Sequence, residues 1–270
     1  MAVTSFFLLF ILSVCDICGC KVTQNLPKHD ITARKNYFLS VQHIFRNFVD
    51  KMTPRILNII VAAGSGSRFG ADRPKQFCML HDRMVLHHAI SRIKAATPDS
   101  HTVVVMSRDW AESVDSLGCT VAIGGATRWH SVKNALAACS DIAADVITVH
   151  DGARPLPSSD MIQRVIHACV NHHGAIPVIP VTDSLRRTDG TPANRADFRA
   201  VQTPQAFRAE LLRRAYDVEF RPEFTDDASV MTAAGFTDIT LVEGDPMNLK
   251  ITLPMDIEIA NVYLQHGAGR

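Results

Sequence analysis

The sequence lacks a large net charge, an even set of cysteines and an apolar run long enough to cross a membrane. Its 28 lysines and arginines nearly balance 27 aspartates and glutamates, for a formal net charge of +1. No overall basic excess therefore points to nucleic acid as a partner. The 7 cysteines are an odd number and the last four contain no CxxC pair, so a closed disulfide framework is excluded. From Arg55 onward the chain is typical of a reduced, cytoplasmic protein.

The first 53 residues differ from the rest in composition. The apolar run Ser5–Val14 is too short to span a bilayer as a helix, although its length suits the core of a signal peptide. No basic residue precedes that run, but basic residues outnumber acidic ones at positions 21–53. Residues 1–53 are interpreted either as an organelle-targeting leader of the plastid type or as the result of a start codon assigned upstream of Met52. Neither interpretation predicts a stable membrane partner, and both leave one domain at residues 54–270.

Short β-branched runs alternate with amphipathic stretches from residue 55 onward. The predicted strands lie at residues 57–62, 102–106, 120–123, 146–149, 175–181 and 239–242. The predicted helices lie at residues 85–95, 128–139, from Ser159 towards Gly174, at 209–220, at 226–234 before Gly235, and from Pro254 onward. Ser159 and Thr252 are expected to cap two of these helices. This order is typical of a Rossmann-like α/β domain, a mostly parallel sheet with helices on both faces.

A polar segment at residues 182–203 interrupts this alternation. It contains Asp189-Gly190, which favours a tight hairpin turn. We expect the segment to form a β-arm that projects from the domain. Because an isolated hairpin is only marginally stable in water, the arm is expected to pack on a second copy of the chain, which predicts a homodimer.

The most informative segment joins the first predicted strand to a glycine loop. It runs from Ile59 to Phe77 with the sequence IIVAAGSGSRFGADRPKQF. Small residues in such a loop expose backbone N–H groups to an anion. The loop lacks the Gly-Lys-Ser/Thr of P-loop enzymes, and Phe69 occupies the place of the third glycine in the dinucleotide fingerprint. Neither of those two nucleotide motifs therefore fits.

Two cations flank this loop, Arg68 and, in a Pro-Lys-Gln sequence, Lys75. A guanidinium and an ammonium beside a row of N–H donors would hold a triphosphate. They would also stabilise the negative charge that develops when an α-phosphorus is attacked and pyrophosphate departs. The alternative is that both are ordinary solvated charges, but their place at a strand end, where α/β sheets bind ligands, favours the triphosphate site.

Six ordered motifs resemble those of the 2-C-methyl-D-erythritol 4-phosphate cytidylyltransferases, enzymes of isoprenoid precursor synthesis. The glycine loop with its Pro-Lys-Gln sequence is the first, and the resemblance extends over residues 55–265. The others are Gly124-Gly125 with Arg128 and Ser131, Val149–Pro155, Thr203–Gln205, Thr225–Ser229 and Asn248–Thr252. The resemblance implies that a nucleotidyltransferase domain transfers a cytidylyl group from CTP to methylerythritol phosphate, a small polyol phosphate.

The same resemblance implies a role for each motif residue. The nucleotide would be bound by small residues and a hydroxyl: Ala62, Ala63, Gly64, Gly66, Gly125 and Ser131. Catalysis would rest on four cations, of which the first two stabilise the transition state and the last two orient the acceptor: Arg68, Lys75, Arg195 and Lys250. The acceptor would also contact Asp151, Arg154, Asp183, Ser184 and Thr225. Arg195 lies in the predicted arm and is therefore expected to act across the dimer.

Mg²⁺ is the cofactor that this class of reaction implies, bridging the triphosphate oxygens. The sequence shows no clustered carboxylate or histidine set with metal-ligand spacing, so the phosphates are expected to supply most of the coordination. Asp151 could reach the metal or the substrate hydroxyls, or could simply form the turn before Gly152. Ser131 could likewise be an ordinary serine on a helix surface. Leu253 and Met255, which replace polar residues usual in the family, are expected to affect packing only.

The sequence leaves four other functions open, of which one, a membrane-tethered module, rests only on the apolar run at residues 5–14. A cytidylyltransferase for another polyol phosphate, such as ribitol 5-phosphate, would share the glycine loop and the lysine segment, although His150–Pro155 favours methylerythritol phosphate. A nucleotidyltransferase for hexose 1-phosphates or a molybdenum cofactor fits the small-residue loop and Thr203–Gln205 less well. A non-catalytic nucleotide-binding protein would have no need of all four cations, Arg68, Lys75, Arg195 and Lys250.

Overall fold

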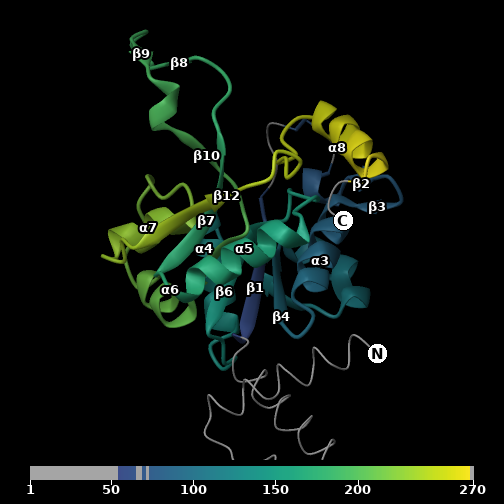
Figure 1. Ribbon diagram of the computed structural model, residues 1–270. Coiled ribbons are helices and arrows are strands. Elements are labelled where there is room, and N and C mark those ends of the chain that lie inside the picture. The colour runs from purple at the N-terminus through teal and green to yellow at the C-terminus, as the bar shows by residue number, and fades with distance from the viewer. Residues whose placement is uncertain (1–53, 65–68, 71–72, 268–270) are drawn as a thin grey trace, which may run out of the picture. The chain divides into compact units, whose positions relative to one another are not determined.

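A mixed sheet of eight strands forms the centre of the domain Pro54–Arg270 in the computed structural model (Figure 1). The structure describes residues 54–64, 69–70 and 73–267, all within one compact unit, Pro54–Arg270. Three predictions therefore lie outside the described residues: the leader at 1–53, Gly66 and Arg68. None of the described helices has the length and apolarity that crossing a membrane requires.

Four parallel strands form one half of the sheet, in the spatial order β6-β1-β4-β5. They are β1 (Ile56–Val61), β4 (His101–Met106), β5 (Thr120–Ile123) and β6 (Val146–Asp151). In the other half, β11 runs antiparallel to β6 and β7, β10 runs antiparallel to β7, and β12 runs parallel to β7. Its strands are β7 (Gly174–Pro180), β10 (Arg199–Val201), β11 (Gln205–Arg208) and β12 (Ile239–Glu243). The expected mostly parallel sheet is confirmed.

Helices cover both faces of this sheet because successive residues of a strand point to opposite sides. Leu57 and Ile59 of β1 pack beneath one group of helices, and Ile60 packs beneath the other. The first group is α4 (Arg128–Ala138), α6 (Ala209–Ala215) and α7 (Asp227–Ala233). The second group is α3 (Val85–Ala96) and α5 (Ser159–Val170). The last helix, α8 (Met255–Gln265), packs in a separate cluster with Leu80 and Ile251.

Shorter elements link these layers. Two of them are strands of a small separate sheet, β2 (Met79–Leu80) and β3 (Arg83–Met84). Three are 3-10 helices, η1 (Lys75–Phe77), η2 (Arg108–Leu117) and η3 (Arg195–Asp197). The two- and three-residue elements among them carry too few residues to show a period in the sequence.

The structure corrects the predictions for residues 203–220. Strand β11 is absent from the predicted strands, because its four residues, QAFR, form neither an apolar run nor an alternating pattern. The helix expected to reach Phe220 ends at Ala215. The chain turns there, and the hydroxyl of the next residue, Tyr216, donates to Asp227 at 2.6 Å.

Two predicted helix starts are also wrong. The residue at the cap position of α5 is Ser158 rather than Ser159, and that helix ends ahead of Gly174, which begins β7. Pro254 occupies the cap position of α8, and Thr252 does not cap it. Instead, the Asp256 carboxylate accepts from the backbone N–H groups of Thr252 and the residue after it. Leu253 and Met255, which replace polar residues usual in the family, have exposed side chains. Their expected effect on packing is therefore not seen in the core.

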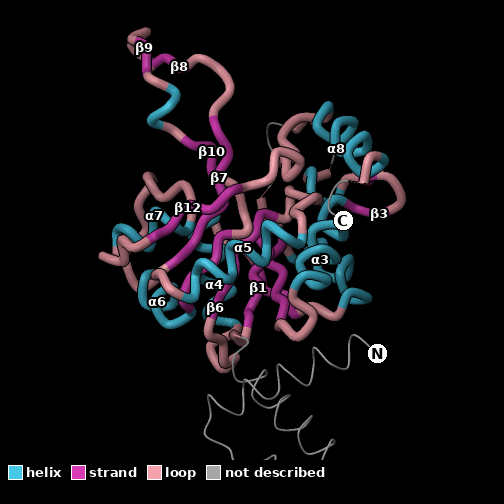
Figure 2. The backbone as a smooth tube through the Cα atoms, viewed as in Figure 1, coloured by secondary structure: helices cyan, strands magenta, loops and turns pink. Residues whose placement is uncertain are grey.

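The expected arm is present but shorter than predicted (Figure 2). Its hairpin pairs β8 (Leu185–Arg186) with β9 (Pro192–Ala193), and Gly190 adopts a positive φ of 86° at the turn. Thr191 N–H donates to the Asp189 carboxylate at 2.8 Å, which closes the turn. The last part of the predicted arm, β10, instead returns to the main sheet and pairs with β7.

A buried histidine supports the end of β6. The Nε2 of His150 lies 3.0 Å from the carbonyl oxygen of Arg154, which can only accept, so Nε2 carries the proton. The Oγ1 of Thr203 accepts from the Asp151 N–H at 3.0 Å. The Thr203 hydroxyl in turn donates its hydrogen to the unprotonated Nδ1 of His150, at 3.1 Å. Burial lowers the pKa of His150 to about 4, so its ring is neutral at pH 7.

This histidine predicts a component of stability that acid removes. Because the pKa of His150 is about 4 in the folded protein, against 6.5 for a solvated histidine, the unfolded chain takes up the proton first as the pH falls. Stability is therefore complete above pH 6.5 and is lost towards pH 4, by an amount on the order of 3 kcal/mol. Urea unfolding at about pH 7 and about pH 4.5 measures this loss. His150→Gln should lose less stability than the wild type over this interval, and equal losses would contradict a buried neutral ring.

Candidate active site

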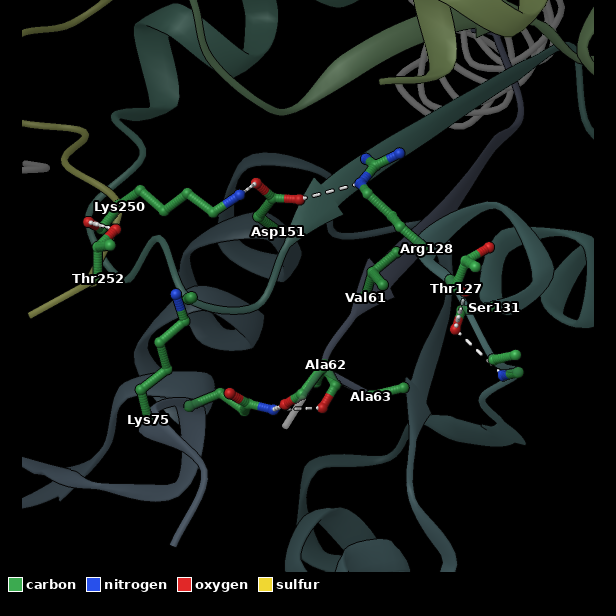
Figure 3. Close-up of a pocket in the computed structure, with 15 residues that line it drawn as sticks. Val61, Ala62, Ala63, Lys75, Thr127, Arg128, Ser131, Asp151, Lys250 and Thr252 are labelled. Carbon is green, nitrogen blue, oxygen red and sulfur yellow. Dashed lines mark hydrogen bonds and ion pairs between the residues drawn. The ribbon is translucent and has the colours of Figure 1, made fainter. Parts of the chain in front are cut away.

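A cavity of about 500 Å³ opens at the carboxyl ends of β1 and β6 (Figure 3). The last residues of these strands, Val61 and Asp151, both line it. Its other walls come from the loop after β1, the turn that carries Lys75, the start of α4 and the segment around Lys250. Ligands of open α/β sheets bind at this edge of the sheet, which makes the cavity the candidate active site.

One wall consists of small residues that leave no spare room. A Cβ atom on Gly124 would lie 2.2 Å from the Cβ of Ala63, and one on Gly125 would lie 2.5 Å from the Cβ of His130. The Oγ of Ser131 accepts from the Gly125 N–H at 3.1 Å and donates within the first turn of α4. Ser131 is buried, so the alternative that it is an ordinary surface serine is wrong. It holds the glycine turn against the start of the helix.

Another wall carries the turn η1. The side chain of Gln76 is buried there, and its Nε2 donates to the carbonyl oxygens of Ala62 at 2.6 Å and Gly64 at 2.7 Å. These two bonds tie η1 to the loop that follows β1. Lys75 consequently lines the cavity beside that loop (Figure 3).

Asp151 lies among three cations at the end of β6. The Nζ of Lys250 donates to its Oδ2 at 2.7 Å, and the Nε of Arg128 donates to its Oδ1 at 3.4 Å (Figure 3). The Nε of Arg154 lies 3.8 Å from Oδ2. Burial alone would raise the pKa of this carboxyl, but the charges of Arg128, Lys250 and Arg154 lower it well below its usual range. Asp151 is therefore ionised at neutral pH, with its carboxylate directed to these cations rather than to a turn.

A second carboxylate holds Arg128 from the other side. The side chain of Asp227, the first residue of α7, is fully buried and accepts from Arg128 Nη2 at 2.7 Å and from the Tyr216 hydroxyl at 2.6 Å. Burial opposes the charge of Arg128, but Asp227 and Asp151 together raise its pKa. Burial and the neighbouring carboxylate also raise the pKa of Tyr216, which keeps its hydroxyl protonated as a donor. Arg128 is thus fixed between two carboxylates.

A smaller cavity, of about 230 Å³, shares part of this lining. Arg128, Asp151 and Lys250 border both cavities, whereas Arg154 and Thr225 border only the smaller one. Groups bound in the two cavities would therefore meet at the same three charged side chains. This arrangement suits a reaction between two anionic molecules.

Most of the predicted site residues come together at these cavities. The larger cavity contains Ala62, Ala63, Gly64, Lys75, Gly125, Ser131, Asp151 and Lys250, and the smaller one adds Arg154 and Thr225. Three others, Arg195, Asp183 and Ser184, are exposed in or beside the arm and line neither cavity of the described chain. A side-chain nitrogen of Arg195 instead donates to the carbonyl of Thr182, where the arm leaves the sheet.

Several residues that build the site have no role in the sequence-based prediction. Arg128 stands in a motif, but its link to Asp227 joins positions 99 residues apart, and no local pattern indicates it. The Pro-Lys-Gln sequence is the available signal for Gln76. Within residues 54–64, 69–70 and 73–267, no three His, Cys, Asp or Glu side chains are grouped so that they could hold a metal ion.

Comparisons with known proteins point to one family. The family model described as IspD, 2-C-methyl-D-erythritol 4-phosphate cytidylyltransferase, matches residues 56–266. The proteins of that name from Bacteroides fragilis and Bacteroides thetaiotaomicron are 39% and 40% identical over 217 residues, which cover 76% of this chain and 98% of each relative. The crystal structure of the Thermus thermophilus protein matches with a TM-score of 0.65 and 33% identity, covering 78% of this chain and 99% of that one. The chain therefore belongs to the 2-C-methyl-D-erythritol 4-phosphate cytidylyltransferase family and is a nucleotidyltransferase.

Proposed function

We propose that this enzyme transfers the cytidylyl group of CTP to 2-C-methyl-D-erythritol 4-phosphate. The products are 4-diphosphocytidyl-2-C-methyl-D-erythritol and pyrophosphate. The observation that carries the proposal is the junction of the two cavities, where Arg128 and Lys250 both contact the ionised Asp151. A nucleotide in the larger cavity and a polyol phosphate in the smaller one would present their reacting groups at this junction.

The larger cavity suits CTP. Ser131 Oγ already accepts one hydrogen bond and donates another, so its second lone pair would accept from the amino group of cytosine. The close contacts of Gly124 and Gly125 leave no room for a larger residue in this wall. Gly64 and Lys75 border the same cavity and would face the triphosphate. Arg68 and Gly66, in the same sequence motif, are proposed to complete the phosphate site.

The reaction needs neither a covalent intermediate nor a general base. An oxygen of the acceptor phosphate, already anionic, would attack the α-phosphorus of CTP in line with the departing pyrophosphate. As the new P–O bond forms, the bond to the β-phosphate oxygen breaks, and its electron pair leaves with pyrophosphate. Lys75 and Arg68 would stabilise the charge that develops on these oxygens. The main task of the protein is therefore to bring two polyanions together in the right orientation.

Mg²⁺ is proposed as the cofactor, and Asp151 would contribute an oxygen ligand to it, or contact the substrate hydroxyls, by giving up its contact with Lys250 or Arg128. A carboxylate is the kind of hard oxygen ligand that Mg²⁺ prefers, and Asp151 is ionised and borders both cavities. When bound, the ion would neutralise charge on the triphosphate oxygens. The phosphates would supply most of its other ligands, because the described residues contain no cluster of three metal-ligating side chains.

The acceptor is proposed to bind in the smaller cavity, with its phosphate near Arg154, Thr225 and Lys250. The arm of a partner subunit would supply Arg195, Asp183 and Ser184, which line neither cavity in their own chain. Two exposed apolar side chains, Phe198 and Val201, follow the hairpin and offer a surface that a second copy would cover. These features support a homodimer that uses the arm in its interface.

Substitution of Lys75 tests the reaction and the phosphate site together. Lys75→Ala should lower the rate of pyrophosphate release by about 100-fold, the size expected for loss of one charge stabiliser of a transition state. The assay contains CTP, Mg²⁺ and either methylerythritol 4-phosphate or ribitol 5-phosphate. Lys133→Ala is the matched control, because Lys133 is exposed on α4 with its Nζ over the Trp129 ring, and it borders neither cavity.

Each result of this assay has a definite meaning. Release that requires methylerythritol phosphate and collapses only in Lys75→Ala supports the proposed reaction. Release with ribitol phosphate alone would keep the chemistry and replace the acceptor. A folded wild type that binds CTP but releases no pyrophosphate with either acceptor would instead indicate a different acceptor or a binding function.

The position of Arg195 is tested by mixing two inactive variants. If Arg195 acts across the dimer, a heterodimer of Lys75→Ala and Arg195→Ala contains one intact site and one doubly altered site. After subunit exchange at equal amounts, half the dimers are mixed, so about a quarter of the wild-type activity should return. If Arg195 acts within its own chain, no site is intact and no activity returns. Size-exclusion chromatography with light scattering checks that the preparations are dimers.

A further inference from the structure

Two glutamines buried in the protein interior hold different walls of the paired cavities. Gln76 and Gln202 each have only 3% of their surface exposed. A glutamine amide has two N–H donors, and burying them without partners is costly. In both residues these donors go to backbone carbonyls of a segment that leads into a cavity wall.

Gln76 determines where two carbonyl groups of the nucleotide wall point. Its Nε2 donates to Ala62 O at 2.6 Å and to Gly64 O at 2.7 Å. A carbonyl oxygen directed at a triphosphate would repel it, whereas one bound to the glutamine is directed away from the ligand. Gln76 itself borders the larger cavity, next to Lys75. One side chain thus fixes both the loop and the turn that carries the catalytic lysine.

Gln202 holds residues 245–248, and the Asn248 carbonyl oxygen to which it donates also accepts from Arg154 Nη1, at 2.7 Å, in the smaller cavity. Its Nε2 donates to Asp245 O at 2.8 Å and to Asn248 O at 3.4 Å, and its Oε1 accepts from the Asp245 N–H at 3.0 Å. The fit is close, because a Cβ atom on Gly244 would lie 2.6 Å from that Oε1. Gln202 borders the smaller cavity and not the larger one.

We propose that Gln76 and Gln202 are positioning residues that act on different substrates. Gln76 positions the wall that binds CTP, and Gln202 positions the wall that binds the polyol phosphate. This inference rests on the proposed function, which assigns CTP to the larger cavity and the acceptor to the smaller one. A role in folding alone would make both residues affect stability without separating the two substrates.

The test replaces each amide by a carboxylate of the same shape. An ionised glutamate has no donor for the carbonyls that the glutamine binds. Because a carboxylate at position 76 would also repel a triphosphate in the cavity that Gln76 borders, Gln76→Met, which removes the donors and adds no charge, must weaken CTP binding as well. Gln76→Glu should weaken CTP binding, measured by calorimetry without acceptor, by about tenfold or more, the size expected from losing these hydrogen bonds. Gln202→Glu should raise the KM for methylerythritol phosphate by a similar factor at saturating CTP. Gln76→Glu should leave the KM for methylerythritol phosphate within about twofold of the wild-type value, and Gln202→Glu should do the same for the dissociation constant of CTP.

Gln163 provides the matched control. This glutamine of α5 also donates its side-chain N–H to a backbone carbonyl, that of Ala96 at the end of α3, but it borders neither cavity. Gln163→Glu should therefore lower the melting temperature without changing the CTP dissociation constant or the acceptor KM. If Gln76→Glu or Gln202→Glu fails to fold, Gln→Met at the same position keeps the length and removes the donors.

Lowering the pH gives a second readout. A protonated glutamic acid regains one donor in its O–H group, so CTP binding by Gln76→Glu, expressed relative to the wild type at each pH, should recover as the pH falls. Gln76→Met should show no such recovery. Weakened CTP binding by the neutral Gln76→Met at every pH would assign the loss to the missing donors, whereas normal binding by this variant would assign it to charge repulsion and contradict the positioning role.

Three outcomes overturn the inference. In the first, either variant weakens the binding of both substrates equally. In the second, both variants weaken the binding of the same substrate. In the third, both variants bind CTP and the acceptor normally and lose only thermal stability. A failure of the proposed function looks different, because the wild type itself would then release no pyrophosphate with CTP and methylerythritol phosphate.

Discussion

The ion pairs of Asp151 join three of the elements that bring a charge to the active site. Its carboxylate receives Lys250 from the segment before α8, Arg128 from the start of α4 and Arg154 from the turn after β6. A buried charge is costly unless it is paired, so these segments are constrained to meet where Asp151 ends its strand. The same constraint places three cations at the edge of the sheet where both substrates are proposed to bind.

The buried Asp227 extends this constraint into the core. Arg128 has two carboxylate partners, and the second of them is shared with Tyr216, at the point where α6 ends. Removing either carboxylate would leave a poorly compensated guanidinium, which costs more than the intact arrangement contributes. The length of α6 and the start of α7 are therefore linked to the orientation of a single arginine in the active site.

Local patterns in the sequence predict those parts of the fold and of the active site that depend on residues close together in the chain. Strands such as β1 and β6 stand out as apolar runs, and the loop from Ala62 to Gly64 stands out through its small residues. Two other features cannot be recognised from local patterns, because both depend on segments distant in the sequence. They are the four-residue strand β11 and the contact between Arg128 and Asp227. Arg195 shows a related limit: its spacing to a motif suggests a role, but the fold of one chain does not bring it to a cavity.

The hydrogen bonds and ion pairs of the site also explain how its cations remain able to bind two polyanions while they contact a neighbouring carboxylate. Arg128 is held by Asp227 as well as by Asp151, so its guanidinium stays between the two. Lys250 gives one donor to Asp151 at 2.7 Å, and an ammonium has three, so the pair with Asp151 does not use up its capacity for phosphate oxygens. Donors fixed in advance need little reorganisation when charge develops, which is the condition for strong electrostatic stabilisation of a transition state. The buried pairs are therefore better understood as the cost of a rigid cation array than as a source of fold stability.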